Sequence, residues 1–215
     1  MRCIGIFGGT FDPIHYGHLR TAYETRAKLG FDEVRFVPCA NPPHRQTAVT
    51  PSEIRLRMLE AAVAAEPGFV IDERELARPG PSYTVDTLSS LREDLPDEAL
   101  CLLLGMDAFL DLPSWHEWER LLELAHIVVA HRPGWQVPRE GALGRLLEQS
   151  RTAHRHDLER ARAGRIHIES VTQLEVSSTE LRRSIRAGIA PKYLLPESVW
   201  RIIVETNCYA QQAET

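Results

Sequence analysis

The stretch GIFGGTFDPIHYGHLR, residues 5–20, decides which fold this chain can adopt. It starts inside an apolar run, Cys3–Phe7, that predicts a buried strand. Two glycines and a Thr-Phe-Asp-Pro turn follow at once. From Gly17 onward apolar residues recur at helical spacing up to Gly30, a residue type that commonly ends helices. A strand, a glycine turn and a helix in direct succession are typical of a parallel sheet covered by helices.

The same alternation of apolar strands and helical periods continues along the chain. Further strands are expected at residues 34–38, 69–71, 100–104, 127–130 and 166–171, and helices from about 50, at 83–91, at 179–186 and at 197–205. Residues 134–164, which are charged and rich in arginine and histidine, are predicted to form a variable helical insertion with solvent-exposed faces. The expected fold is one α/β domain over residues 1–215, a Rossmann-like doubly wound parallel sheet with helices on both faces and a small C-terminal helical part at about 179–205.

Composition and charge restrict the classes of partner. With 43% hydrophobic and 26% charged residues, the 215-residue chain has the composition of one globular domain. A net charge of -5 argues against general binding to nucleic acid or to anionic membranes, and no apolar run approaches the ~20 residues of a membrane span. The first apolar stretch is too short for a secretory signal, and the four cysteines show no C-x-x-C spacing. We therefore expect a cytoplasmic protein with reduced thiols and no nucleic-acid or membrane partner. The sequence does not specify the oligomeric state, and a homo-oligomer is one of the states it allows.

Gly8, Gly9 and Thr10 follow the first strand, at the edge of a parallel sheet where ligands commonly bind. The spacing is neither G-x-G-x-x-G nor G-x-x-x-x-G-K-[ST], so the fingerprints of dinucleotide dehydrogenases and P-loop NTPases are missing. A glycine pair alone also fits a tight turn. His15 and His18, however, bracket the start of the next helix and can face the same side of its first turn. Two imidazoles at a helix N-terminus suit a polyphosphate; the alternatives are a zinc pair, for which further ligands are missing nearby in sequence, and ordinary surface histidines.

The longer stretch GGTFDPIHYGH, residues 8–18, resembles the signature of the nucleotidyltransferase superfamily that includes the class I aminoacyl-tRNA synthetases, in which a [T/H]-x-G-H element binds ATP. Further motifs follow in order and resemble those of the bacterial nicotinate mononucleotide adenylyltransferase (nicotinate-nucleotide adenylyltransferase) family: NPPHR (41–45), SYTVDT (82–87), GMDAFLDLPSW (105–115), RPG (132–134) and SSTELR (177–182). The resemblance spans residues 3 to 204. It implies a transferase of NAD biosynthesis that joins ATP and nicotinate mononucleotide into nicotinate adenine dinucleotide, releases pyrophosphate, and forms no covalent enzyme intermediate.

An ATP site is the first feature that the resemblance implies. It would consist of Gly8, Gly9, Thr10, Phe11, His15, His18, Gly105, Asp107, Ser178, Thr179 and Arg182. His15 and His18 are the catalytic candidates, and His18 is expected to contact the α-phosphate. Taken without the resemblance, Ser177, Ser178 and Thr179 are better interpreted as a plain helix cap, and a cap is also the simple interpretation of Asp107. Mg²⁺ is expected to arrive on the ATP phosphates, with no protein side chain as its ligand.

A second half-site for nicotinate mononucleotide is also implied. It would consist of His44, Arg45, Tyr83, Thr84 and Trp115. Trp115 offers a flat face on which the pyridine ring can stack, and the Thr84 segment is expected to receive the pyridine carboxylate, whereas Trp118 and Trp200 are predicted to be core residues. Two other functions stay open: a phosphopantetheine adenylyltransferase, which would share the HYGH element but not SYTVDT and GMDAF, and a non-catalytic nucleotide-sensing module of the same fold.

Overall fold

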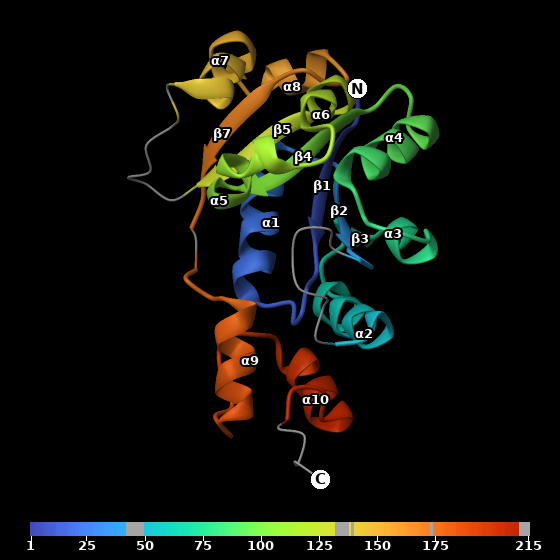
Figure 1. Cartoon of the computed structure of the whole chain (residues 1–215), viewed down its shortest axis with the longest axis vertical. Coiled ribbons are helices and arrows are strands. Elements are labelled where there is room, and N and C mark those ends of the chain that lie inside the picture. Colours follow the sequence, from blue (N-terminus) through green and yellow to red (C-terminus); the bar gives the residue numbers. More distant parts are fainter. Residues whose placement is uncertain (42–49, 132–137, 139, 173, 211–215) are drawn as a thin grey trace.

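The computed structural model of the chain describes residues 1–41, 50–131, 138, 140–172 and 174–210. Within them a parallel sheet has seven strands in the order β3-β2-β1-β4-β5-β7-β6, with helices on both faces (Figure 1). The strands are β1 Cys3–Gly9, β2 Glu33–Pro38, β3 Phe69–Ile71, β4 Ala99–Gly105, β5 His126–His131, β6 Arg151–Thr152 and β7 Ile166–Ser170. The α-helices are α1 Tyr16–Leu29, α2 Ser52–Val63, α3 Arg74–Ala77, α4 Thr84–Asp94, α5 Met106–Leu110, α6 Leu121–Leu124, α7 Gly141–Ser150, α8 His156–Arg160, α9 Ser178–Arg186 and α10 Glu197–Thr206, with short 3₁₀ turns at Leu112–Ser114 and Trp118–Arg120. The α/β fold predicted from the sequence is confirmed.

Apolar side chains alternate between two hydrophobic cores, one on each face of the sheet. Along β4, Leu100 and Leu102 belong to one core and Cys101 and Leu103 to the other, since successive side chains of a strand point to opposite faces. Helices α1, α2, α8, α9 and α10 contribute to the core that contains Cys101, and α4, α5, α6 and α7 contribute to the other. A strand that is buried on both faces needs a continuous apolar run, and this is why β4 was recognisable from the sequence.

The strand order changes direction between β1 and β4. β1 pairs with β2 on one side and with β4 on the other, where Cys3 is in register with Ala99. Helix α1, which follows β1, packs on one face of the sheet, and α5, which follows β4, packs on the other. In open α/β sheets, connections that diverge in this way leave the crevice in which ligands bind, outside the carboxyl ends of the two strands.

The N-terminal elements agree closely with the prediction. β1 runs two residues beyond Phe7, so Gly8 and Gly9 are its last residues rather than the start of the turn. α1 stops at Gly30, whose φ of 72° lies in the left-handed region and whose N–H donates to the Arg26 carbonyl. This is the C-terminal stop that the glycine predicted.

The stretch predicted as a helical insertion, residues 134–164, lies partly outside the described residues. Its described part contains α7, β6 and α8. Helix α7 buries Leu143 and Leu147 in a core of the sheet, so one of its faces is covered rather than exposed. Strand β6, which the sequence did not predict, adds an edge strand to β7. In the part of the chain that the structure covers, every helix is too short or too polar to cross a membrane.

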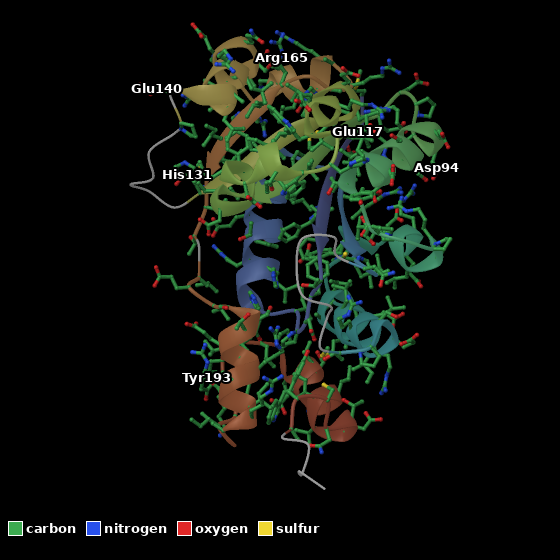
Figure 2. The ribbon with its side chains drawn as sticks, in the orientation of Figure 1. Asp94, Glu117, His131, Glu140, Arg165 and Tyr193 are labelled. Carbon is green, nitrogen blue, oxygen red and sulfur yellow. The ribbon has the colours of Figure 1, made fainter. Side chains whose placement is uncertain are left out.

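The predicted C-terminal helices occur as α9 and α10, which form one end of the molecule below α1 and α2 (Figure 1). Ser198 Oγ of α10 donates to the Ala61 carbonyl of α2 at 2.9 Å and so docks the two helices. Tyr193, between α9 and α10, lies on the outside and is 91% exposed (Figure 2). Trp118 and Trp200, predicted as core residues, are only partly buried against the two cores.

Candidate functional site

The carboxyl ends of β1 and β4 present two glycines to open space. A Cβ placed on Gly8 or on Gly105 would meet no heavy atom within 4 Å. Gly9 differs, because a Cβ there would lie 3.0 Å from the ring of Phe11. Gly8 and Gly105 therefore leave room for a ligand to approach the backbone, whereas Gly9 makes room for an aromatic side chain of the protein itself.

Buried side chains support the turn after β1, residues 10–13, from the protein interior. Phe11 is fully buried at a φ of 48°, and the peptide bond between Asp12 and Pro13 is cis. Arg55 of α2, also fully buried, donates from Nη1 to the Thr10 carbonyl at 2.7 Å and from Nε to the Thr50 carbonyl at 3.1 Å. The shape of the turn is thus fixed by side chains packed beneath it, which leaves its outer side available to a ligand.

The two histidines of the HYGH element lie against each other, on the same side as predicted. Their ring centroids are 3.7 Å apart with an angle of 22° between the planes. His15 is the N-cap residue of α1 and is buried, and burial lowers the pKa of its imidazole to about 4. A Cβ on Gly17 would lie 3.0 Å from the His15 ring, so the absence of a side chain at Gly17 leaves room for that ring. His18 is half-buried, and its ring is in an edge-to-face arrangement with the rings of Phe7 and Phe11.

The N-terminus of α9 meets the same turn. Ser178 Oγ donates to the Pro13 carbonyl at 3.0 Å, and Arg182 donates from Nη1 to the Asp12 carbonyl at 2.6 Å and from Nη2 to Thr179 Oγ1 at 3.2 Å. Ser177, the N-cap residue, makes no side-chain capping bond. The Ser178 hydroxyl and the Arg182 guanidinium therefore connect α9 to the turn, and the plain-cap interpretation does not describe Ser178.

Two helix N-termini thus converge on residues 10–15. α1 starts directly after His15, and α9 is attached to Pro13 through Ser178. Each helix start carries backbone N–H groups without intrahelical partners and the positive end of a helix dipole. Together with the guanidinium of Arg182, this arrangement suits a multiply charged anion such as a polyphosphate.

A second group of residues lies at the start of α4. Thr84 is the first residue of that helix, and the ring of Tyr83 lies 4.3 Å from the ring of His116. Trp115, which precedes His116, is partly buried against the same core as Tyr83. The structure therefore brings three predicted residues, Tyr83, Thr84 and Trp115, into one region and adds His116. His116 was not predicted from the sequence, although it directly follows the GMDAFLDLPSW motif.

Hydrogen bonds that were not predicted from the sequence hold the start of α4, one of them between two buried side chains. Thr87 Oγ1 donates to Glu75 Oε1 at 2.6 Å, and the Asn41 N–H donates to Ser82 Oγ at 3.3 Å. Both Glu75 and Thr87 are buried, and desolvation raises the pKa of the Glu75 carboxyl. These contacts tie α4 to α3 through Glu75, and they tie Ser82, just before α4, to Asn41, three residues after β2.

The remaining predicted site residues occupy different positions. Asp107 is exposed in the first turn of α5, two residues after Gly105. His44 and Arg45 lie outside the described residues. Among the residues that the structure describes, no group of three or more His, Cys, Asp or Glu side chains is arranged to hold a metal ion.

Comparison with known proteins agrees with this geometry. The cytidylyltransferase-like family matches residues 6–184 of the chain. A probable nicotinate-nucleotide adenylyltransferase of Methylococcus capsulatus is 50% identical over 209 residues, which cover 97% of this chain and 100% of that protein. One from Aeromonas hydrophila is 50% identical over 206 residues, 96% of each. Among solved structures, the Plasmodium falciparum nicotinic acid mononucleotide adenylyltransferase complexed with NaAD is similar with a TM-score of 0.73 at 19% identity, over 97% of this chain and 98% of that one.

Proposed function

The chain belongs to the cytidylyltransferase-like family and, within it, to the nicotinate-nucleotide adenylyltransferases, and from this premise we propose that it transfers the adenylyl group of ATP to nicotinate mononucleotide. An oxygen of the mononucleotide 5′-phosphate attacks the α-phosphorus of ATP, and the bond from that phosphorus to the bridging oxygen of the β-phosphate breaks. Nicotinate adenine dinucleotide forms and pyrophosphate leaves, a step of NAD biosynthesis. The attacking group belongs to the substrate, so the protein supplies no nucleophile and no covalent intermediate forms.

The observation that carries this proposal is the convergence of α1, α9 and Arg182 on the turn beside Gly8 and Gly105. Phosphoryl transfer is accelerated mainly by positioning and by neutralising charge on the phosphates. In the proposed complex the adenosine lies along the open glycines, and Ser178, Thr179 and Arg182 bind the β- and γ-phosphates. His18, which is nearer to solvent than His15, donates to the α-phosphate as charge develops.

The second substrate belongs at the start of α4. Trp115 stacks on the pyridine ring, and N–H groups near Thr84 receive the pyridine carboxylate, because the free N–H groups at a helix start suit an anion. The contacts that fix Ser82 and Thr87 support this role, since they hold the helix start rigid before a ligand arrives. His44 and Arg45 are proposed to add positive charge beside the mononucleotide phosphate.

Mg²⁺ is proposed to enter on the ATP phosphates. Beside the turn, the described residues offer N–H, imidazole and guanidinium donors, which suit phosphate oxygens rather than a cation. The carboxylate in the turn, that of Asp12, is buried and accepts from the Tyr209 hydroxyl. When bound, the ion would offset negative charge on the phosphate chain. The protein is proposed to act in the cytoplasm on these small molecules, with no nucleic-acid or membrane partner.

A turnover assay tests the proposal. Purified protein is mixed with ATP, Mg²⁺ and nicotinate mononucleotide, and the dinucleotide and pyrophosphate are quantified separately. Equal amounts of the two products are expected. ATP binding without any product would identify a nucleotide-sensing module, and activity only with phosphopantetheine would identify the related adenylyltransferase instead.

A further inference from the structure

Tyr209 connects the segment after α10 to the turn at the site. Its hydroxyl donates to Asp12 Oδ1 at 2.6 Å, and both side chains are buried, with 1% and 3% of their surfaces exposed. Burial raises the pKa of the Tyr209 phenol, and the Asp12 charge acts in the same direction. The hydroxyl therefore keeps its proton and donates to the carboxylate, a type of hydrogen bond stronger than one between neutral groups.

Asp12 also contacts Arg182, the arginine proposed to bind phosphate. The Asp12 carbonyl accepts from Arg182 Nη1 at 2.6 Å, and the next carbonyl, that of Pro13, accepts from Ser178 Oγ. Both contacts between α9 and the turn therefore end on the backbone at residues 12–13. A rotation of the Asp12 backbone would therefore move the carbonyl oxygen that orients the Arg182 guanidinium.

Arg55 supports the turn at a different residue from Tyr209. Arg55 holds the Thr10 carbonyl, two residues before Asp12. Tyr209 contacts the Asp12 side chain, and through it the residue whose carbonyl meets Arg182. The guanidinium has five N–H donors, more than its contacts with Asp12 and Thr179 use, so it can bind phosphate while resting on the turn.

We propose that Tyr209 is a positioning residue of the nucleotide site: by fixing the Asp12 carboxylate it fixes the Asp12 carbonyl, which presents Arg182 to the β- and γ-phosphates of ATP. The proposal rests on the proposed function for the identity of the anion. Tyr209 lies far along the chain from the signature. It affects ATP affinity through Asp12 and Arg182, without contacting ATP itself.

Tyr209→Phe tests this, because it removes the hydroxyl and keeps the ring. The dissociation constants for ATP and for inorganic pyrophosphate are measured by calorimetry without the second substrate, well below the Tm of each variant. Both constants are expected to rise about tenfold, an effect typical of losing one hydrogen bond to a charged group. The KM for nicotinate mononucleotide should change by less than about twofold. If too little Tyr209→Phe protein folds, Asp12→Asn, which weakens the same bond from the other side, is measured in its place.

Two comparisons separate positioning from general stability. Ser198→Ala removes the hydroxyl that docks α10 on α2 without touching the turn, and it should lower Tm but leave both dissociation constants unchanged. In an Arg182→Ala background, Tyr209→Phe should have little further effect on ATP affinity, since residues that act through one another are not additive. Unchanged ATP affinity in Tyr209→Phe, an equal loss in Ser198→Ala, or full additivity with Arg182→Ala would each overturn the proposal. Because these measurements are of binding, they stand even if the wild type forms no dinucleotide, which would refute the proposed function alone.

Discussion

The imidazole rings of His15 and His18 are stacked 3.7 Å apart, yet their surroundings give them different properties. His15 is buried, and the lowered pKa of its ring leaves it uncharged at neutral pH. His18 is only half-buried, and besides stacking on His15 it makes edge-to-face contacts with two phenylalanine rings. Because His18 is the less buried of the two rings, it is the one proposed to contact phosphate.

His18→Ala is expected to lower kcat far more than it weakens binding of nicotinate mononucleotide. A donor aimed at charge that develops in the transition state is worth roughly 2.7–4 kcal/mol, so kcat should fall about a hundred- to a thousandfold. Steady-state kinetics together with the dissociation constant of the mononucleotide measure both effects. His156→Ala, on the exposed side of α8, serves as a control and should behave as wild type. Near-normal turnover of His18→Ala would remove this residue from the mechanism.

His15 should make stability depend on pH. The folded-state pKa of about 4 lies below the ordinary 6.5, so between these values the unfolded chain binds a proton that the folded chain excludes. Stability contributed by the neutral ring is therefore lost as the pH falls through this window, by about 2 kcal/mol from about pH 7.5 to about pH 5. Urea unfolding of wild type and His15→Gln at both pH values measures it as the difference between their pH dependences. Identical pH dependence in the two proteins would contradict the burial argument.

Alanine at the two neighbouring glycines should have opposite consequences. Gly8→Ala adds a methyl group where no atom lies within 4 Å, so the free energy of unfolding should change by less than about 0.5 kcal/mol while ATP affinity falls about tenfold. Gly9→Ala adds one against the Phe11 ring and should destabilise the fold by about 1–3 kcal/mol. Urea unfolding and ATP calorimetry on both variants test this pair. Wild-type ATP affinity in Gly8→Ala would mean that the nucleotide does not approach β1 there.

The enzyme is expected to prefer nicotinate mononucleotide to its amide counterpart by about a hundredfold or more, since hydrogen bonds from the α4 start to a charged group contribute about 1.5–3 kcal/mol each. Stacking on Trp115 cannot distinguish an acid from an amide strongly, so Trp115→Ala should weaken both substrates alike. Specificity constants for both substrates, in wild type and variant, decide the matter. Trp118→Ala, which removes an indole from the same core, is the matched control and should leave the preference and both constants unchanged. Equal use of acid and amide by wild type would refute the carboxylate site.

The strands and the long helices could be predicted because their sequence patterns are local. The run Leu100–Leu104 and the helical spacing that ends at Gly30 each specify one element without help from the rest of the chain. Helices α3 and α6 could not be predicted in this way, since four residues barely span one helical turn and such helices exist only through tertiary packing. Strand β6 likewise exists through its pairing with β7.

The residues of the candidate site also fall into two groups, those that a sequence motif marks and those that only tertiary contacts reveal. His15, His18 and Arg182 stand in motifs whose residue order is visible in the sequence. Arg55 and Tyr209 are not marked by any local pattern: one lies in a helix of mixed polarity, and the other follows the last helix. Their importance comes from contacts with Thr10 and Asp12, which are distant in the sequence and which only the folded chain reveals.

The central place of β1 has a consequence for how the chain is made. β1 precedes all other strands in the sequence, yet one of its edges stays uncovered until β4 has been synthesised, because Cys3 pairs in register with Ala99. The turn that follows β1 gains its contacts with α9 and Tyr209 later still, when residues 178–209 have left the ribosome. A nucleotide stabilises only a state that can bind it. In the proposed complex ATP binds at this turn, so it cannot assist the nascent chain before α9 and Tyr209 have emerged. Until β4 is available the chain exposes an unpaired edge of β1, and exposed strand edges are a known origin of aggregation.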